Sequence, residues 1–220
     1  MSKGVWRYLK VAVIQTIDIS GIDNSPYGLT TDGKFLWFTG QQNTRVYQID
    51  KQGNLISSFG VTTTPYDMAT DGKFLWVILF QFPAISVINQ YDKTGNLISS
   101  IDLAALGFLF TEGLTTDGKF LWFSCPTWNL RQISKTGDLI NLLNPVAEAQ
   151  GLTTDKKFIW FTYSDDSAAG FIAQMDKAGN RIQTINVSAT DKLPKGITTD
   201  GKFLWWIGSK NDILVQSDKT

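Results

Sequence analysis

The chain is a succession of short apolar segments separated by polar turns, and one combination of the two recurs throughout. In its first copy, Gly28-Leu-Thr-Thr31 leads into an Asp-Gly turn, after which Phe35-Leu-Trp-Phe38 follows. All four residues of this last segment are apolar, which is typical of a strand that is buried on both faces. The pattern therefore predicts strands that are covered by neighbouring elements on each side.

The string Thr-Asp-Gly-Lys-Phe-Leu-Trp occurs five times with small changes, and Lys156 takes the place of the glycine in the fourth copy. The steps between successive aspartates are 39, 46, 38 and 45 residues, which is the period of propeller blades. The aspartates are Asp32, Asp71, Asp117, Asp155 and Asp200.

Each repeat predicts four short strands joined by tight turns. In the first repeat, the third strand is Val46–Ile49 and the fourth is Leu55–Phe59. The turn between them, Asp50-Lys-Gln-Gly-Asn54, recurs with small changes at 92–96, 134–138 and 176–180. Asp, Gly and Asn tolerate positive φ and hydrogen-bond their own backbone, so they favour tight hairpins. Four strands with such turns indicate an antiparallel meander.

The two ends of the chain complement each other. The C-terminus ends within the turn that precedes a fourth strand, and Ile14-Gln-Thr-Ile17 near the N-terminus matches the fourth strand Ile182-Gln-Thr-Ile185. Both strands are followed by the repeated aspartate at the same distance. The N-terminal strand is thus expected to pair with the third strand of the last blade and close the ring, which hides open edges. A ten-bladed dimer is compatible with the same pattern.

The sequence therefore predicts an all-β fold, a single five-bladed β-propeller over residues 1–220 in which residues 11–20 complete the last blade. The tryptophan of each repeat offers a flat surface that could stack on a sugar, but a large residue at one point per blade is better interpreted as packing between blades. The blades are centred on Trp37, Trp76, Trp122, Trp160 and Trp205.

Composition narrows the function classes. Twenty Lys and Arg balance twenty Asp and Glu, so charge gives no reason to expect nucleic acid as a partner. Histidine is absent, which removes histidine acid–base chemistry and histidine-ligated metals. Cys125 is the single cysteine and lacks a histidine base, so we interpret it as a buried small residue. No apolar segment approaches the about 20 residues of a membrane span, no signal peptide is evident, and nothing indicates a cellular location.

The blade motif resembles that of bacterial propellers of the virginiamycin B lyase, NHL and YVTN type. The shared residues are Pro26-Tyr-Gly-Leu-Thr-Thr-Asp-Gly, Leu36-Trp-Phe-Thr39 and the later Gly53-Asn-Leu-Ile56. The resemblance implies the blade and its ring, over almost the whole chain. In the lyase branch it also implies an axial histidine with acidic residues and a divalent metal. This chain has no histidine to fill that role, so no catalytic residue, metal or cofactor is predicted.

The loops that differ between repeats lie at one end of the blades, and function is expected there. Several of them carry apolar residues that either fold into a local core or form a surface for a partner. These candidate partner-binding residues are Phe80, Phe82, Phe108, Phe110 and Trp128.

The mouth of the central channel is the second candidate site. The residue at which each innermost strand is expected to begin varies between blades, and in the second blade Asp67 follows it where the other blades have glycine. Such polar groups are either a solvated rim or a site for a small ligand or calcium, and two carboxylates could also act as an acid–base pair. The candidate ligand-binding residues are Tyr27, Tyr66, Asp67, Glu112, Gln150 and Lys195.

Three functions are compatible with these features. The first is a non-enzymatic binding or scaffold propeller that contacts a protein partner, or copies of itself, through its variable loops. The second is a lectin-like or small-ligand-binding propeller, for which carbohydrate is one ligand class. The third is a metal-dependent lyase or hydrolase that uses Asp67 and Glu112.

Overall fold

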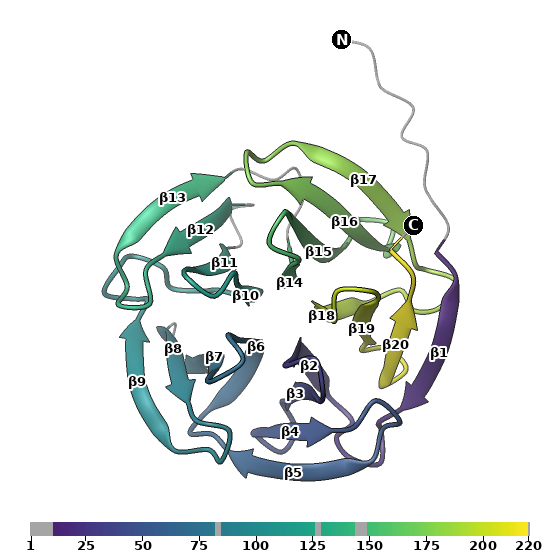
Figure 1. The fold of residues 1–220 in the computed structure, drawn as a ribbon, viewed down its shortest axis with the longest axis horizontal. Helices are drawn as coiled ribbons and strands as arrows, with labels where there is room; N and C mark the ends of the chain where they lie inside the picture. Colours follow the sequence, from purple (N-terminus) through teal and green to yellow (C-terminus); the bar gives the residue numbers. More distant parts are fainter. Residues whose placement is uncertain (1–10, 82–84, 126–128, 144–148, 220) are drawn as a thin grey trace.

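The structure is a computed structural model that describes residues 11–81, 85–125, 129–143 and 149–219. Within these ranges the chain forms twenty strands in five antiparallel sheets of four strands each. The sheets stand around a central axis like the blades of a propeller (Figure 1). The predicted all-β, five-bladed fold is confirmed. The described residues include no helix that could cross a membrane.

In blades 1 to 4 the strands follow one another outward from the axis in chain order. Blade 1 contains β2 (Pro26–Thr31), β3 (Leu36–Gly40), β4 (Arg45–Ile49) and β5 (Leu55–Gly60). Blade 2 contains β6 (Thr64–Thr70), β7 (Leu75–Gln81), β8 (Ile85–Tyr91) and β9 (Leu97–Asp102). Blade 3 contains β10 (Leu114–Thr116), β11 (Leu121–Cys125), β12 (Asn129–Ile133) and β13 (Leu139–Leu143). Blade 4 contains β14 (Gly151–Thr154), β15 (Phe158–Ser164), β16 (Gly170–Asp176) and β17 (Arg181–Asn186).

Blade 5 combines the two ends of the chain. Its inner strands are β18 (Pro194–Thr199), β19 (Leu204–Gly208) and β20 (Ile213–Ser217), and its outer strand is β1 (Val13–Asp18). The β1–β20 pair is antiparallel, with Thr16 opposite Val215. The predicted closure of the ring by the N-terminal strand is therefore confirmed, and it takes place within one chain.

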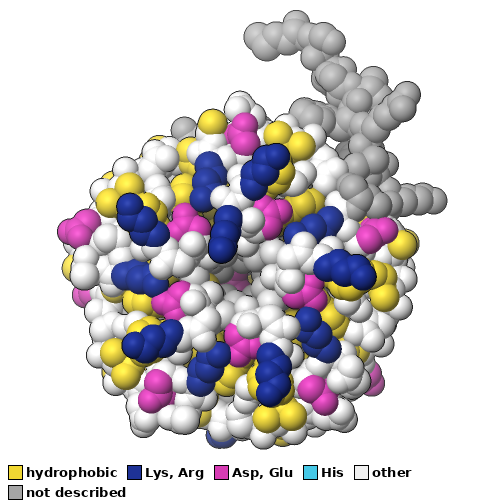
Figure 2. Space-filling view, in the orientation of Figure 1, with side chains coloured by type: hydrophobic (Ala, Val, Ile, Leu, Met, Phe, Trp, Pro, Cys, Tyr) yellow, Lys and Arg dark blue, Asp and Glu magenta, His cyan; other side chains and the backbone are white. Residues whose placement is uncertain are grey.

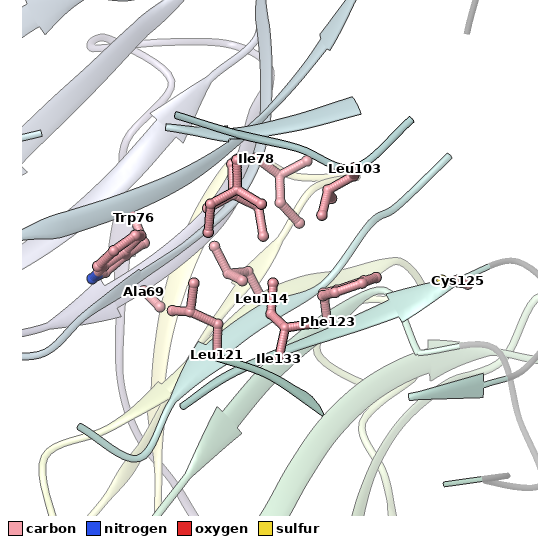
Figure 3. Packing of buried hydrophobic residues seen from close by; sticks show 11 residues of the cluster. Ala69, Trp76, Ile78, Leu103, Leu114, Leu121, Phe123, Cys125 and Ile133 are labelled. Atoms are coloured by element: carbon pink, nitrogen blue, oxygen red, sulfur yellow. The ribbon is translucent and has the colours of Figure 1, made fainter. Parts of the chain in front are cut away.

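The core lies between neighbouring blades. Figure 3 shows the junction of blades 2 and 3, where Trp76 and Ile78 of β7 share one cluster with Leu121 and Phe123 of β11. The five repeated tryptophans are at most 2% exposed. This burial confirms that they pack between blades and are not available to stack on a ligand. Cys125 belongs to the same cluster, and burial raises the pKa of its thiol to about 11.

The repeated aspartates join each blade to the next through a ring of ion pairs. The aspartate of the turn between the first two strands pairs with a lysine in the outer hairpin turn of the following blade. We call the end of the ring at which these turns lie the turn face. Figure 2 shows acidic and basic side chains encircling the central opening on this face. The described residues form the pairs Asp32–Lys93, Asp71–Lys135, Asp117–Lys177, Asp155–Lys219 and Asp200–Lys51, at 2.6, 2.6, 3.2, 3.8 and 2.8 Å.

Asp200 shows how many contacts one such carboxylate makes. Its Oδ1 accepts the backbone N–H groups of Lys202 and Phe203, and its Oδ2 accepts the indole N–H of Trp205 at 3.1 Å and Lys51 Nζ at 2.8 Å. Burial by itself would raise the pKa of Asp200, but these donors and the charge of Lys51 lower it to about 2. One side chain therefore shapes a turn, orients a core tryptophan and binds the next blade.

We expect the two members of this ion pair to differ in their effect on stability. Lys51→Met removes the charge and keeps the apolar stem, so it should cost less than about 1 kcal/mol, as partly exposed ion pairs do. Asp200→Ala leaves several donors without an acceptor and should cost about 2–3 kcal/mol. Urea unfolding measures both values. Lys202→Met, which changes an exposed lysine of the same turn, is the control, and equal costs for Asp200→Ala and Lys51→Met would contradict the assignment.

Candidate functional site at the channel mouth

The channel mouth lies at the end of the ring opposite the turn face. Each innermost strand passes from the mouth to the turn face. Near its start, four blades have a glycine that lies close to the axis, and blade 2 has Asp67 at the same position. The residue before this position therefore lies at the mouth in every blade. Four residue types occupy this one position in the five blades: Tyr27, Tyr66, Glu112, Gln150 and Lys195. The scaffold is thus repeated while its mouth is not.

The aromatic and charged members of this ring contact one another across blade boundaries. The rings of Tyr27 and Tyr66 meet edge to face, with centroids 5.0 Å apart. Lys195 Nζ lies 4.6 Å from the centre of the Tyr27 ring and donates to its hydroxyl at 3.3 Å. On the other side, burial raises the pKa of Tyr66, and the charge of Glu112 raises it further. A cation and a carboxylate therefore flank a pair of tyrosines.

Hydroxyl groups hold the backbone of the mouth in place. Thr39 Oγ1 accepts the N–H of Gly28 in its own blade and donates to the carbonyl of Tyr66 in the next. Thr162 does the same between Gly151 and Lys195. Ser124 occupies the corresponding place in blade 3, where it binds Gly113 and Ala149. These bridges are buried and fix the positions of the strands from which the mouth side chains project.

Asp67 lies beneath the mouth at the centre of the ring and is 0% exposed. Its Oδ1 accepts the N–H of Leu29 at 3.2 Å, and its Oδ2 accepts those of Leu114 at 2.8 Å and Leu152 at 3.2 Å. These amides come from the innermost strands of blades 1, 3 and 4. Asp67 therefore connects four blades at the axis and closes the channel under the mouth.

The close approach of the strands explains the glycines that surround Asp67. A Cβ atom at Gly28 would lie 2.5 Å from the Cα of Asp67. At Gly113 it would lie 2.9 Å from the Leu152 side chain, which is also closer than real Cβ atoms come. At this position the other four blades have glycine, and only blade 2 has a side chain, that of Asp67, which lies at the centre of the ring.

Burial raises the pKa of Asp67 to about 8, although the amide hydrogen bonds act in the opposite direction. Its carboxyl group does not reach the mouth, because both oxygens are occupied by backbone amides of the scaffold. Asp67 and Glu112 are therefore not a pair of exposed carboxylates. Among the residues that the structure describes, no three acidic or cysteine side chains are grouped so that they could hold a metal ion.

The second set of sequence candidates adjoins the mouth through Tyr66. The Tyr66 ring contacts Phe80 and Phe110, with centroids 5.9 and 5.7 Å apart, and these two phenylalanines contact each other at 5.3 Å. Phe108 instead packs on the core residue Phe123 and lies under Arg131. Phe80 and Phe110 thus adjoin the mouth, whereas Phe108 belongs to the edge of the core. Phe82 and Trp128 are outside the described residues.

Comparisons with known proteins place this geometry in context. No family model matches the chain, and no curated protein matches it. Among solved structures, glutaminyl cyclase from Myxococcus xanthus has a TM-score of 0.76 at 12% identity, covering 96% of this chain and 97% of that one. A streptogramin B lyase has a TM-score of 0.54 at 14% identity, covering 96% and 99%. A protein of unknown function from Bacteroides caccae has a TM-score of 0.54 at 12% identity, covering 88% and 82%.

The chain shares its fold with two named enzymes. The resemblance of the blade motif to propellers of the virginiamycin B lyase type is therefore confirmed at the level of the fold. The expectation that the chain is not an enzyme is corrected by the same comparisons, because two of the solved structures that share its fold are named as enzymes. The absence of histidine excludes particular mechanisms and does not exclude enzymatic activity.

We expect Asp67 to make stability depend on pH. An ordinary aspartate in the unfolded chain ionises near pH 4, whereas in the folded chain Asp67 ionises near pH 8. Between these values the folded state keeps a proton that the unfolded state releases, so the stability that Asp67 contributes should be fully present below about pH 4 and decrease as the pH rises to 8. The chain has no histidine, so few other side chains titrate between pH 5 and 8.

Urea unfolding of Asp67→Asn at pH 5 and pH 8 tests this expectation. The variant should lose the decrease in stability between the two pH values. At pH 5 it should be less stable by about 1–3 kcal/mol, because an amide nitrogen would face backbone N–H groups that need an acceptor. Asp166→Asn, on the exposed loop after β15, is the control. A wild-type pH slope that persists in Asp67→Asn would contradict the assignment.

Proposed function

We propose that the chain binds a small zwitterionic ligand, such as an amino acid or a short peptide, at the channel mouth. The observation that carries this proposal is the order of groups around the mouth: Lys195, Tyr27, Tyr66 and Glu112 come from four successive blades. A carboxylate of the ligand would face Lys195 and its ammonium group would face Glu112. The two tyrosines would bind the apolar part between these charges.

The contrast between scaffold and mouth supports a single ligand at this place. A site that is repeated in every blade would need the same residue at each mouth position, whereas the five positions hold two tyrosines, a glutamate, a glutamine and a lysine. Ligand pockets usually combine aromatic walls with a few polar groups that fix orientation. Asp67 closes the channel beneath, so a ligand would remain at the mouth and would not pass through the ring.

Any chemistry at this site would use Glu112 and Lys195 as the groups that transfer protons to or from the bound molecule. Both are side chains whose pKa can be adjusted by burial and by neighbouring charges. The shared fold with a glutaminyl cyclase supports including a peptide with N-terminal glutamine among the compounds to be tested.

We expect a zwitterionic compound to raise the melting temperature in a saturable manner when single amino acids and glutaminyl dipeptides are screened. Lys195→Met and Glu112→Gln should each weaken that binding about tenfold or more, because each removes a charge-assisted contact. Lys210→Met, an exposed lysine in the loop between β19 and β20, is the matched control.

The same screen can contradict the proposal. If no amino acid or dipeptide shifts the melting temperature, or if only neutral sugars do so, the zwitterion assignment is wrong. Turnover is tested separately by mass spectrometry, since cyclisation of N-terminal glutamine releases ammonia. Loss of ammonia that requires Glu112 would place catalysis at the mouth.

A second candidate function is contact with a protein partner, or with another copy of the chain, through the loop between β9 and β10. Two leucines on this loop, Leu106 and Leu109, are 40% and 56% exposed. The backbone of Leu109 is held by the buried hydroxyl of Ser86, whereas its side chain points outward. A fixed, exposed apolar side chain favours association.

Leu109→Ser and Phe108→Ser should have different effects. Leu109→Ser should remove association and leave the melting temperature nearly unchanged. Phe108→Ser should cost about 2–4 kcal/mol, since Phe108 packs on the core through Phe123. Light scattering over a hundredfold range of concentration measures association, and urea unfolding measures stability. A wild-type chain that is monomeric throughout this range would rule out self-association and leave only a different protein as partner.

A further inference from the structure

A pocket of about 490 Å³ lies on the turn face, between the inner turns of blades 4 and 5. Its walls include Thr154, Asp155, Lys156 and Lys157 from blade 4, with Thr199 and Lys219 from blade 5. The innermost strands separate it from the channel mouth, because β14 has Gln150 at one end and this turn at the other. The pocket is therefore independent of the ligand site proposed above.

The pocket is formed where the sequence departs from its repeat. Lys156 has a φ of 74°, a left-handed conformation that side chains with a Cβ adopt at a cost. The other four blades have glycine at this position, namely Gly33, Gly72, Gly118 and Gly201, all with positive φ. A lysine at this position does not stabilise the turn, because glycine adopts the same conformation in the other four blades without strain. Backbone strain of this kind is often found at functional sites.

Positive charge is concentrated at this junction. Lys156 and Lys157 are exposed, and among the described residues neither forms an ion pair. Lys219 faces Asp155 at 3.8 Å, which is longer than the other four pairs of the ring. Three lysines and the carboxylate of Asp155 therefore line this pocket. The corresponding turns of the other blades have glycine in place of Lys156. The junction carries an excess of two positive charges on a chain with no net charge.

We propose that this pocket binds a small molecule that carries a phosphate group. A dianionic group would match the two excess charges, and lysine is a common phosphate ligand. The volume lies in the range of small-molecule pockets and exceeds that of a phosphate ion, so an organic part would also fit. A nucleic acid is a poorer match, because the repeated aspartates interrupt the lysines around the ring and leave no continuous basic surface.

Thermal unfolding with inorganic pyrophosphate as the probe tests the proposal, at an ionic strength held constant with sodium chloride. The wild-type melting temperature should rise in a saturable manner as the probe is added. Lys156→Gly, which restores the residue of the other four blades, should weaken binding at least tenfold. Its melting temperature without the probe should equal or exceed that of the wild type, because the strained residue is gone.

Two further variants separate the site from general charge effects. Lys156→Asn removes the charge but tolerates the left-handed conformation, so it should also lose binding. Lys119→Gln removes a lysine from the equivalent turn of blade 3 and should bind like the wild type. If all variants respond to pyrophosphate alike, or if the wild type responds no more than to sodium chloride, the pocket is not a phosphate site.

Discussion

The structure depends on one repeated interaction, in which a turn aspartate binds its own turn and the next blade at once. Each aspartate accepts two backbone amides through one oxygen, and its other oxygen pairs with a lysine of the following blade, by a hydrogen bond in four blades and at 3.8 Å for Asp155. In three blades the second oxygen also accepts the indole of the buried tryptophan. Because an isolated sheet of four strands cannot bury both faces, contacts between blades decide stability. The aspartates supply the polar part of these contacts, and the tryptophans supply the apolar part.

A ring built in this way has consequences for function. Its inner strands are held by contacts that are nearly identical in every blade, so side chains at the channel mouth project from a fixed frame. The Thr39, Ser124 and Thr162 bridges add to this rigidity without repeating in every blade. Binding groups on a rigid frame lose little conformational entropy when a ligand binds. Residues of four types at one position of a nearly symmetric scaffold are therefore suited to form the single site that we propose.

The scaffold could be predicted well from the sequence because the same pattern of strands and turns recurs in every blade. Apolar strands, Asp-Gly turns and Asp-Lys-x-Gly-Asn hairpins agree with one another at every repeat, and the matching ends predicted the closure through β1. The sequence also singled out the mouth residues, since variation at one register position is visible in the repeat, and their role as a site stays a prediction. The packing of the tryptophans between blades was predicted, but the ion pairs between blades were missed. The signal for the ion-pair ring was present, as an aspartate and a lysine that recur at fixed places, but which blade each lysine reaches depends on the geometry of the ring.

The role of Asp67 shows where reasoning from residue type fails. A carboxylate in place of glycine at the channel mouth suggests a group that faces solvent, and the sequence analysis paired it with Glu112. The close packing of the innermost strands instead turns it inward, where it accepts three amides from other blades. Whether a departure from the repeat points inward or outward follows from the twist of the strand, which the repeat pattern does not encode.

Asp67 and Lys156 both replace a repeated glycine, and together they show how such departures can be interpreted. At Asp67 the side chain satisfies buried amides, so the scaffold itself accounts for the substitution. At Lys156 no such account exists: the backbone is held in a left-handed conformation, the side chain is exposed, and the adjacent ion pair is longer than its counterparts. In a repeat protein, a departure that strains the fold and satisfies nothing within it is the stronger indication of a ligand, because only an interaction outside the chain remains to explain it.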